Sequence, residues 1–117
     1  MLHARLRRTP EGPKKFVVVL EDGTGNQRTI RFGQLGASDY TIHKDYERML
    51  RYLHRHSYPE DWRHRSVDNV RSTREDWSDP YTAGFWSRWL LWSRPSLRQA
   101  KDVITRRFGI TFGSRRY

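Results

Sequence analysis

Histidines and carboxylates are the residues of this chain that would do metal or acid–base chemistry, and their spacing argues against both. The chain holds five histidines and no cysteine. His54 and His56 are two residues apart, so on a helix they point in different directions. The sequence contains no HExxH, GxSxG or P-loop motif. The carboxylates of two Glu-Asp-Trp triplets, at 60–62 and 75–77, lie beside arginines as solvated ion pairs do. We therefore expect no metal, cofactor, small-molecule substrate or enzymatic activity.

The clustering of tryptophan and arginine is the strongest remaining indication of function in the sequence. The stretch TAGFWSRWLLWSRPS (82–96) holds three of the five tryptophans, with Arg88 and Arg94 among them. These indoles could stack on nucleic-acid bases. Alternatively, in a chain that is only 35% hydrophobic, they fill a thin core that arginine side chains cover. We expect most of the cluster to be core, and Trp62, Trp77 and Trp92 to be exposed anchors for a protein partner, because Trp and Arg dominate binding hot spots.

A β-hairpin is the first element needed to support this cluster. FVVVL (16–20) is a β-branched run, RTIRF (28–32) alternates, and Asp22-Gly23 with Gly25-Asn26 supply turn residues. Two strands alone are marginal in water. The terminal ITF (110–112), or a strand from a neighbouring chain, would complete the sheet.

Three helices follow from the apolar periodicity and the capping residues, at 44–56, 82–92 and 96–108. A long polar connection, residues 57–80, separates the first two. The sequence predicts a single α+β domain over 15–112, in which the hairpin is covered by about three short helices. Its expected core comprises Tyr46, Leu50, Leu53, Trp86, Trp89, Leu90, Ile104 and Phe108.

The charge of the chain predicts an anionic partner. There are 23 Lys and Arg residues against 13 Asp and Glu, a net charge of +10. The two ends, 1–14 and 113–117, are expected to be an extended basic arm and tail. No stretch approaches the about 20 apolar residues of a membrane span. The basic residues expected to bind the partner are Arg5, Arg7, Arg8, Lys14, Lys15, Arg88, Arg94, Arg115 and Arg116.

Four motifs together resemble a family of small proteins encoded by nucleocytoplasmic large DNA viruses. They are FG (32–33), SDYTIHKD (38–45), RYLHRH (51–56) and TAGFWSRWLLW (82–92), and the resemblance covers roughly residues 15–108. The family brings no assigned enzymatic activity. The link before TAGFW is longer here and holds a second Glu-Asp-Trp, so either copy could occupy the family's position.

The resemblance implies a viral protein, and the composition suits one stabilised by its neighbours. Our hypothesis is a non-enzymatic structural protein of the virion, a minor capsid protein that bridges or cements larger capsid proteins. The expected partners are the major and other minor capsid proteins and, additionally, viral DNA, with assembly in the host-cell cytoplasm. The alternative is a basic nucleic-acid-binding protein that packages the genome or binds single strands through Arg and Trp.

Overall fold

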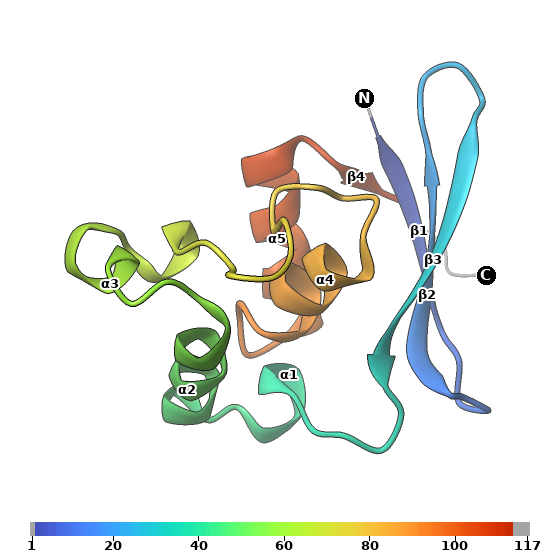
Figure 1. Ribbon diagram of the computed structural model, residues 1–117. Helices are drawn as coiled ribbons and strands as arrows, with labels where there is room; N and C mark the ends of the chain where they lie inside the picture. The colour runs from blue at the N-terminus through green and yellow to red at the C-terminus, as the bar shows by residue number, and fades with distance from the viewer. Residues whose placement is uncertain (1, 114–117) are drawn as a thin grey trace.

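A four-stranded mixed sheet forms one side of the molecule (Figure 1). The structure is a computed structural model and describes residues 2–113. Strands β1 (His3–Arg8), β2 (Lys14–Glu21) and β3 (Gln27–Gln34) pair antiparallel, and the short β4 (Thr111–Phe112) joins β1 in parallel, giving the order β3-β2-β1-β4. The α+β class predicted from the sequence is confirmed.

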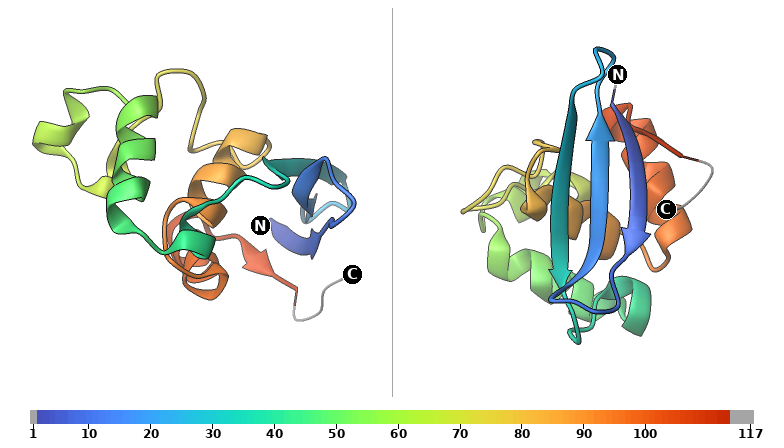
Figure 2. Two further views of the ribbon diagram at one scale, coloured as in Figure 1. Left: turned by 90° about the horizontal axis from the view of Figure 1, so that it is seen from below. Right: turned by 90° about the vertical axis from the view of Figure 1, so that its right-hand side faces the viewer.

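The sheet packs its helices against one face only (Figure 2). Because side chains alternate along a strand, Phe16, Val18 and Leu20 of β2 point to the helices together with Leu6 of β1 and Ile30 of β3, and all five are buried. Phe16 and Phe32 stack on this face with their ring centroids 5.6 Å apart. The opposite face carries no helix (Figure 2, right).

The predicted basic arm is wrong for residues 3–8, which form strand β1. Ala4 and Leu6 alternate with charged residues and are buried against β2, so this segment has the two-residue period of a half-buried strand. The central strand β2 is apolar on both faces and needs a neighbour on each side. The terminal ITF does enter the sheet, but beside β1 and not beside the hairpin. Of the predicted tail, residues 114–117 lie outside the described residues.

The middle of the chain forms short helices away from the sheet (Figure 1). They are α1 (Tyr40–His43), α2 (Tyr46–His56), α3 (Asp61–His64) and the single 3₁₀ turn η1 (Val67–Asn69). Asp45 caps α2 by accepting hydrogen bonds from the backbone N–H groups of Glu47 and Arg48, which satisfies two donors at the helix start. The connection 57–80, predicted to be long and polar, thus contains α3 and η1, and the rest of it is irregular.

The predicted helix 82–92 is one α turn followed by a π-helix. α4 (Ala83–Trp86) begins at Thr82, whose hydroxyl accepts from the N–H of Phe85, and η2 (Ser87–Leu91) continues it in π geometry. α5 (Leu97–Phe108) is capped by Ser96 at its start and ends at Gly109, whose φ of 71° is left-handed. These elements lie between the sheet and the middle helices.

Two apolar clusters share the interior. The larger lies between the sheet and α4, η2 and α5, and contains Trp86 and Trp89. The smaller lies under α2 and contains Met49, Leu53 and Trp77. Trp92 packs against both. Tyr46 was expected in the core but is 51% exposed, because Met49 and Leu53 are the residues of α2 that face inward. Among residues 2–113 no helix is long and apolar enough to cross a membrane.

Candidate functional site

The basic residues predicted to bind a partner are separated by the fold. Arg5 and Arg7 lie on the helix-free face of the sheet. Arg8 lies on the other side, with its guanidinium 4.9 Å from the centroid of Phe16. Lys14 is exposed at the start of β2. Arg115 and Arg116 lie outside the described residues.

Lys15 has a structural partner. Its ammonium forms an ion pair with Asp39, and the two side chains are 9% and 2% exposed. Asp39 also caps α1, accepting from the backbone N–H of Thr41 at 2.9 Å. The pair therefore fastens the start of β2 to α1, and Lys15 is not a freely exposed contact as predicted.

Arg88 and Trp77 are buried, so their predicted exposure is wrong. Arg88 is 0% exposed and lies over the ring of Trp89, with its guanidinium carbon 4.2 Å from the ring centroid. It donates hydrogen bonds to the carbonyl oxygens of Val67 at 3.0 Å and Trp92 at 3.2 Å. Burial lowers the pKa of Arg88 to about 10, so the group stays charged at neutral pH. It connects the π-helix to η1.

Trp62 and Trp92 are half-buried in intramolecular stacks. The ring of Trp62 stacks on His54 with centroids 3.7 Å apart, and its N–H donates to the hydroxyl of Ser57. Trp92 lies parallel to Tyr52 at 4.2 Å. Burial raises the pKa of the Tyr52 hydroxyl to about 12. Base stacking by either indole would compete with a stack already made inside the protein.

Arg94 forms a bidentate pair with Asp68. Its two guanidinium nitrogens donate to the carboxylate at 3.0 and 2.6 Å, and the hydrogen bonds raise the pKa of Arg94. Asp68 also lies 3.8 Å from Arg88. One carboxylate thus pairs with two arginines that were predicted to face a partner.

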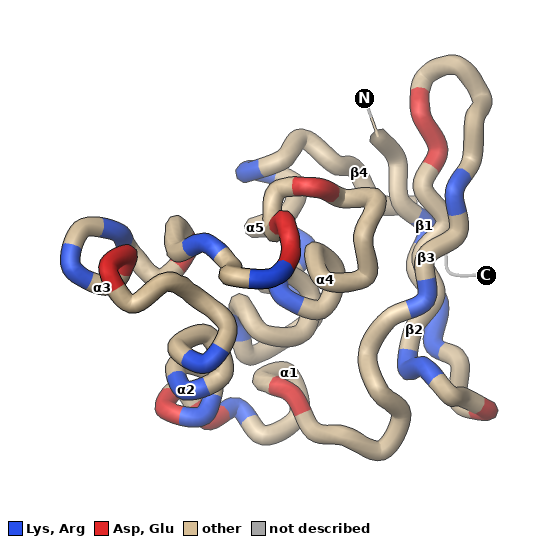
Figure 3. The backbone as a smooth tube through the Cα atoms, in the orientation of Figure 1, with Lys and Arg blue, Asp and Glu red and all other residues tan. Residues whose placement is uncertain are grey.

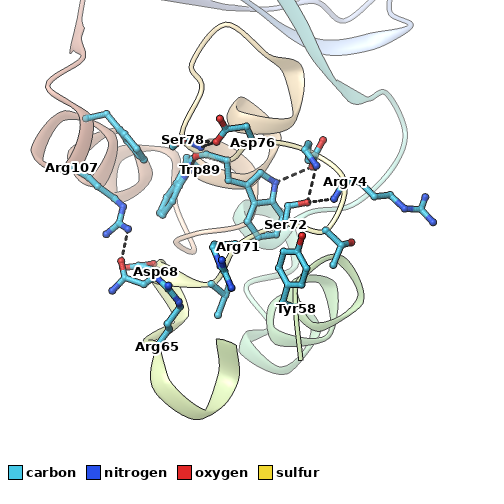
Figure 4. Close-up of a pocket in the computed structure, with 16 residues that line it drawn as sticks. Tyr58, Arg65, Asp68, Arg71, Ser72, Arg74, Asp76, Ser78, Trp89 and Arg107 are labelled. Carbon is cyan, nitrogen blue, oxygen red and sulfur yellow. Dashed lines mark hydrogen bonds between the residues drawn. The ribbon is translucent and has the colours of Figure 1, made fainter. Parts of the chain in front are cut away.

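A polar groove of about 650 Å³ runs along the connection 57–80 (Figure 4). Trp77 and Trp89 line it together with four arginines. Arg71 is held by Asp61, and Arg107 by Asn69. The hydroxyl of Ser72 accepts from two backbone N–H groups. The described residues that line this groove include neither histidine nor cysteine, and its four arginines face three carboxylates, Asp68, Glu75 and Asp76.

A second hollow, of about 400 Å³, lies at the end of the sheet where β3 leads into α1, and it is mainly apolar. Leu35 and Ile42 are 42% and 59% exposed there, which is unusual for large aliphatic residues in so polar a chain. The hydrogen bond from the Leu35 N–H to the Pro13 carbonyl holds the turn before β2 against this segment. We call this site the apolar hollow. It is lined by Arg8, Pro10, Lys15, Leu35, Gly36, Ala37, Ser38 and Ile42.

Sequence reasoning missed the apolar hollow. Leu35 and Ile42 each stand alone among polar residues and glycine, outside any apolar period. Such isolated residues are usually unremarkable at a surface. Only the fold brings them together. Among residues 2–113 no group of three or more His, Cys, Asp or Glu residues could hold a metal ion.

Comparison with known proteins gives one match. The model of a family of unknown function, DUF5754, matches residues 4–56, slightly less than half of the chain. The matched segment runs from β1 to the end of α2 and contains every residue that lines the apolar hollow. No curated protein and no solved structure matches the chain.

Proposed function

We propose that the protein is a non-enzymatic structural protein of a large DNA virus particle, a minor capsid protein that attaches to a larger capsid protein. The resemblance of its motifs to a family encoded by such viruses supports the viral setting. The partly neutralised polar groove offers little for catalysis. The apolar hollow is the observation that carries the attachment to a protein.

The apolar hollow has the composition of a small protein–protein contact. Its lining includes the exposed aliphatic residues Leu35 and Ile42 and the cations Arg8 and Lys15. Interfaces bury an apolar centre and leave a polar rim in contact with water. The occupant that fits is a segment of the capsid protein with an apolar side chain between Leu35 and Ile42 and a carboxylate facing Arg8, since Lys15 is already paired with Asp39.

Incorporation into particles tests the proposal. The double variant Leu35→Ser/Ile42→Ser removes the apolar centre without touching the two buried clusters. Tyr81→Ser is the control, because Tyr81 is 40% exposed and lies outside the hollow. Each tagged protein would be expressed in infected cells, and its amount per particle measured by quantitative mass spectrometry of purified virions.

We expect the double variant to fall at least about tenfold in particles, which corresponds to about 1.4 kcal/mol of lost binding, while Tyr81→Ser is incorporated normally. Equal incorporation of both variants would show that the hollow is not the attachment site. Absence of the wild-type protein from purified particles would overturn the structural function itself.

A further inference from the structure

The helix-free face of the sheet is a second surface, distinct from the apolar hollow (Figure 2). In an antiparallel pair, residues opposite one another in register point to the same side. The register places Arg7, Val17 and Arg31 in one row across the three long strands, and Arg5, Val19 and Thr29 in the next. A third row contains His3, Glu21 and Gln27. We call these nine residues the outer face.

The outer face is positively charged. It holds three arginines and one carboxylate, Glu21, which pairs with Arg5 at 3.2 Å. Arg7 and Arg31 form no salt bridge within residues 2–113. In Figure 3 the Lys and Arg positions of the sheet gather toward the end at the β1–β2 turn, where one acidic position also lies, and further acidic positions lie near the β2–β3 turn. The charge is therefore concentrated where β1 ends and β3 approaches its own end.

Arg7 and Arg31 flank Val17 in register on this surface. Val17 lies between them in register and is only 3% exposed, although no helix covers it. The methylene stems of its two neighbours are the groups placed to cover it, with the guanidinium groups left in water. Strands are about 4.8 Å apart, so the two backbones that carry these arginines are about 10 Å apart.

The side chains of the outer face fit phosphate better than protein. The face has no Trp, Tyr or Phe, and its two valines are shorter than the polar side chains beside them. It therefore lacks the large protruding side chains that anchor a protein interface. Arg, Thr and Gln are donors that commonly contact phosphate oxygens. Single-strand binding would need exposed rings for stacking.

We infer that the outer face binds the phosphate backbone of a double-stranded nucleic acid without reading its sequence. This goes beyond the proposed function, because a minor capsid protein need not contact the genome. It also differs from stacking through tryptophan, since the described indoles are buried or already stacked. The protein would then contact capsid protein through the apolar hollow and the genome through the outer face.

The test compares two double variants of equal charge. Arg7→Gln/Arg31→Gln removes the two unpaired cations of the outer face. Arg51→Gln/Arg55→Gln removes two exposed cations from α2, which lies away from the sheet. Binding of each purified full-length protein to a mixed-sequence DNA duplex would be measured by fluorescence anisotropy over a salt series. Circular dichroism would verify that both variants are folded.

We expect Arg7→Gln/Arg31→Gln to weaken binding by at least about tenfold at low salt, and to reduce the slope of log K against log salt by about 2, because each phosphate contact contributes about 0.9. The control variant Arg51→Gln/Arg55→Gln should retain most of the affinity and most of the salt dependence. Glu21→Gln removes the single carboxylate of the face and should tighten binding. This opposite sign keeps the test decisive if the double variant folds poorly.

Three results would overturn the inference. Equal losses in the two double variants would mean that binding follows overall charge. Competition by polyglutamate as effective as competition by duplex, at equal charge, would assign the face to acidic protein. Tighter binding to a single strand than to the duplex, with quenching of tryptophan fluorescence, would favour stacking. None of these measurements involves Leu35 or Ile42, so failure here leaves the proposed attachment to capsid protein standing.

Discussion

At the scale of single residues, Arg88 shows how this arginine-rich chain uses one cation as interior structure. Its guanidinium lies between Trp77 and Trp89, and its hydrogen bonds connect two backbone segments that are 21 and 4 residues away. A buried charge is tolerated only when it is paired and hydrogen-bonded. Asp68, 3.8 Å away, and two carbonyl groups supply partners for the two terminal nitrogens, while the buried Nε has no hydrogen-bond partner among the described residues. Arg88 is therefore part of the core.

Replacing Arg88 by methionine should therefore destabilise the fold. Arg88→Met keeps apolar volume but leaves two carbonyl oxygens without their donor and removes the contact with Trp89. The expected loss is about 2–3 kcal/mol in the free energy of unfolding, measured by urea denaturation. Arg51→Met, at an exposed position of α2, should change stability by less than about 0.5 kcal/mol. Equal stability of the two variants would contradict a structural role for Arg88.

Asp61 provides a pH-dependent test of the connection 57–80. Hydrogen bonds from the Arg71 guanidinium and backbone N–H, at 2.8–3.1 Å, lower the pKa of Asp61 from 3.8 to about 2. A carboxyl whose pKa is lower in the folded state stabilises the fold above its unfolded pKa, and this contribution is lost as the pH falls through the folded pKa.

The stability difference between wild type and Asp61→Asn should thus be constant above about pH 4 and shrink between about pH 4 and 2. Urea denaturation of both proteins across this range measures it. A difference that does not change with pH would show that the Asp61–Arg71 pair does not persist in solution.

At the scale of elements, β1 has the alternating pattern of a strand, but neighbouring residues obscure that pattern in the sequence. Ala4 and Leu6 alternate with charged residues, but Ala4 is small and Pro10 and Pro13 follow closely, so the segment resembled an arm. The stronger clue was β2, whose FVVVL run is apolar on both faces. A strand of that kind is a central one and requires two neighbours.

Gly33 adopts a left-handed backbone conformation near the end of β3. Its φ is +76°, and a Cβ placed there would lie 3.0 Å from Leu91 Cδ1. Gly33→Ala should lower the free energy of unfolding by about 1–2 kcal/mol, since a left-handed backbone costs an alanine about that much. Gly23→Ala is the matched control, because nothing lies within 4 Å of its added Cβ. Equal thermal denaturation of the two variants would refute this.

The helices were easier to predict than the connection between them. The capping residues and apolar period located the start and end of α2 and α5 to within about two residues. The π-helix at 87–91 could not be predicted, because it keeps the apolar character of an α-helix while shifting which residue faces inward. Arg88 is one of the buried residues of this π-helix. The groove and the apolar hollow depend on contacts between distant segments, which periodicity does not report.

At the scale of the whole molecule, the tryptophans resolve the problem of a thin core. Trp86 and Trp89 are buried as predicted, while Trp77 supplies the second cluster and Trp92 joins the two. With the indoles buried or stacked, the exposed large apolar residues of the described chain are two aliphatic residues and three tyrosines: Leu35, Ile42, Tyr46, Tyr58 and Tyr81. The fold thus separates an apolar contact at one end of the sheet from a basic outer face, an arrangement suited to a protein that joins two different partners.

Cross-linking mass spectrometry on intact, purified virions tests the central claim most directly, using chemistry that captures carboxylates as well as lysines. Lys15 lines the apolar hollow, and Lys14 and Lys44 lie one residue from Lys15 and two residues from Ile42 along the chain. We predict links from these lysines to the major capsid protein or to another minor capsid protein. Particles that lack the protein, or in which it links only to DNA-associated proteins of the particle interior, would contradict the proposed function as a minor capsid protein.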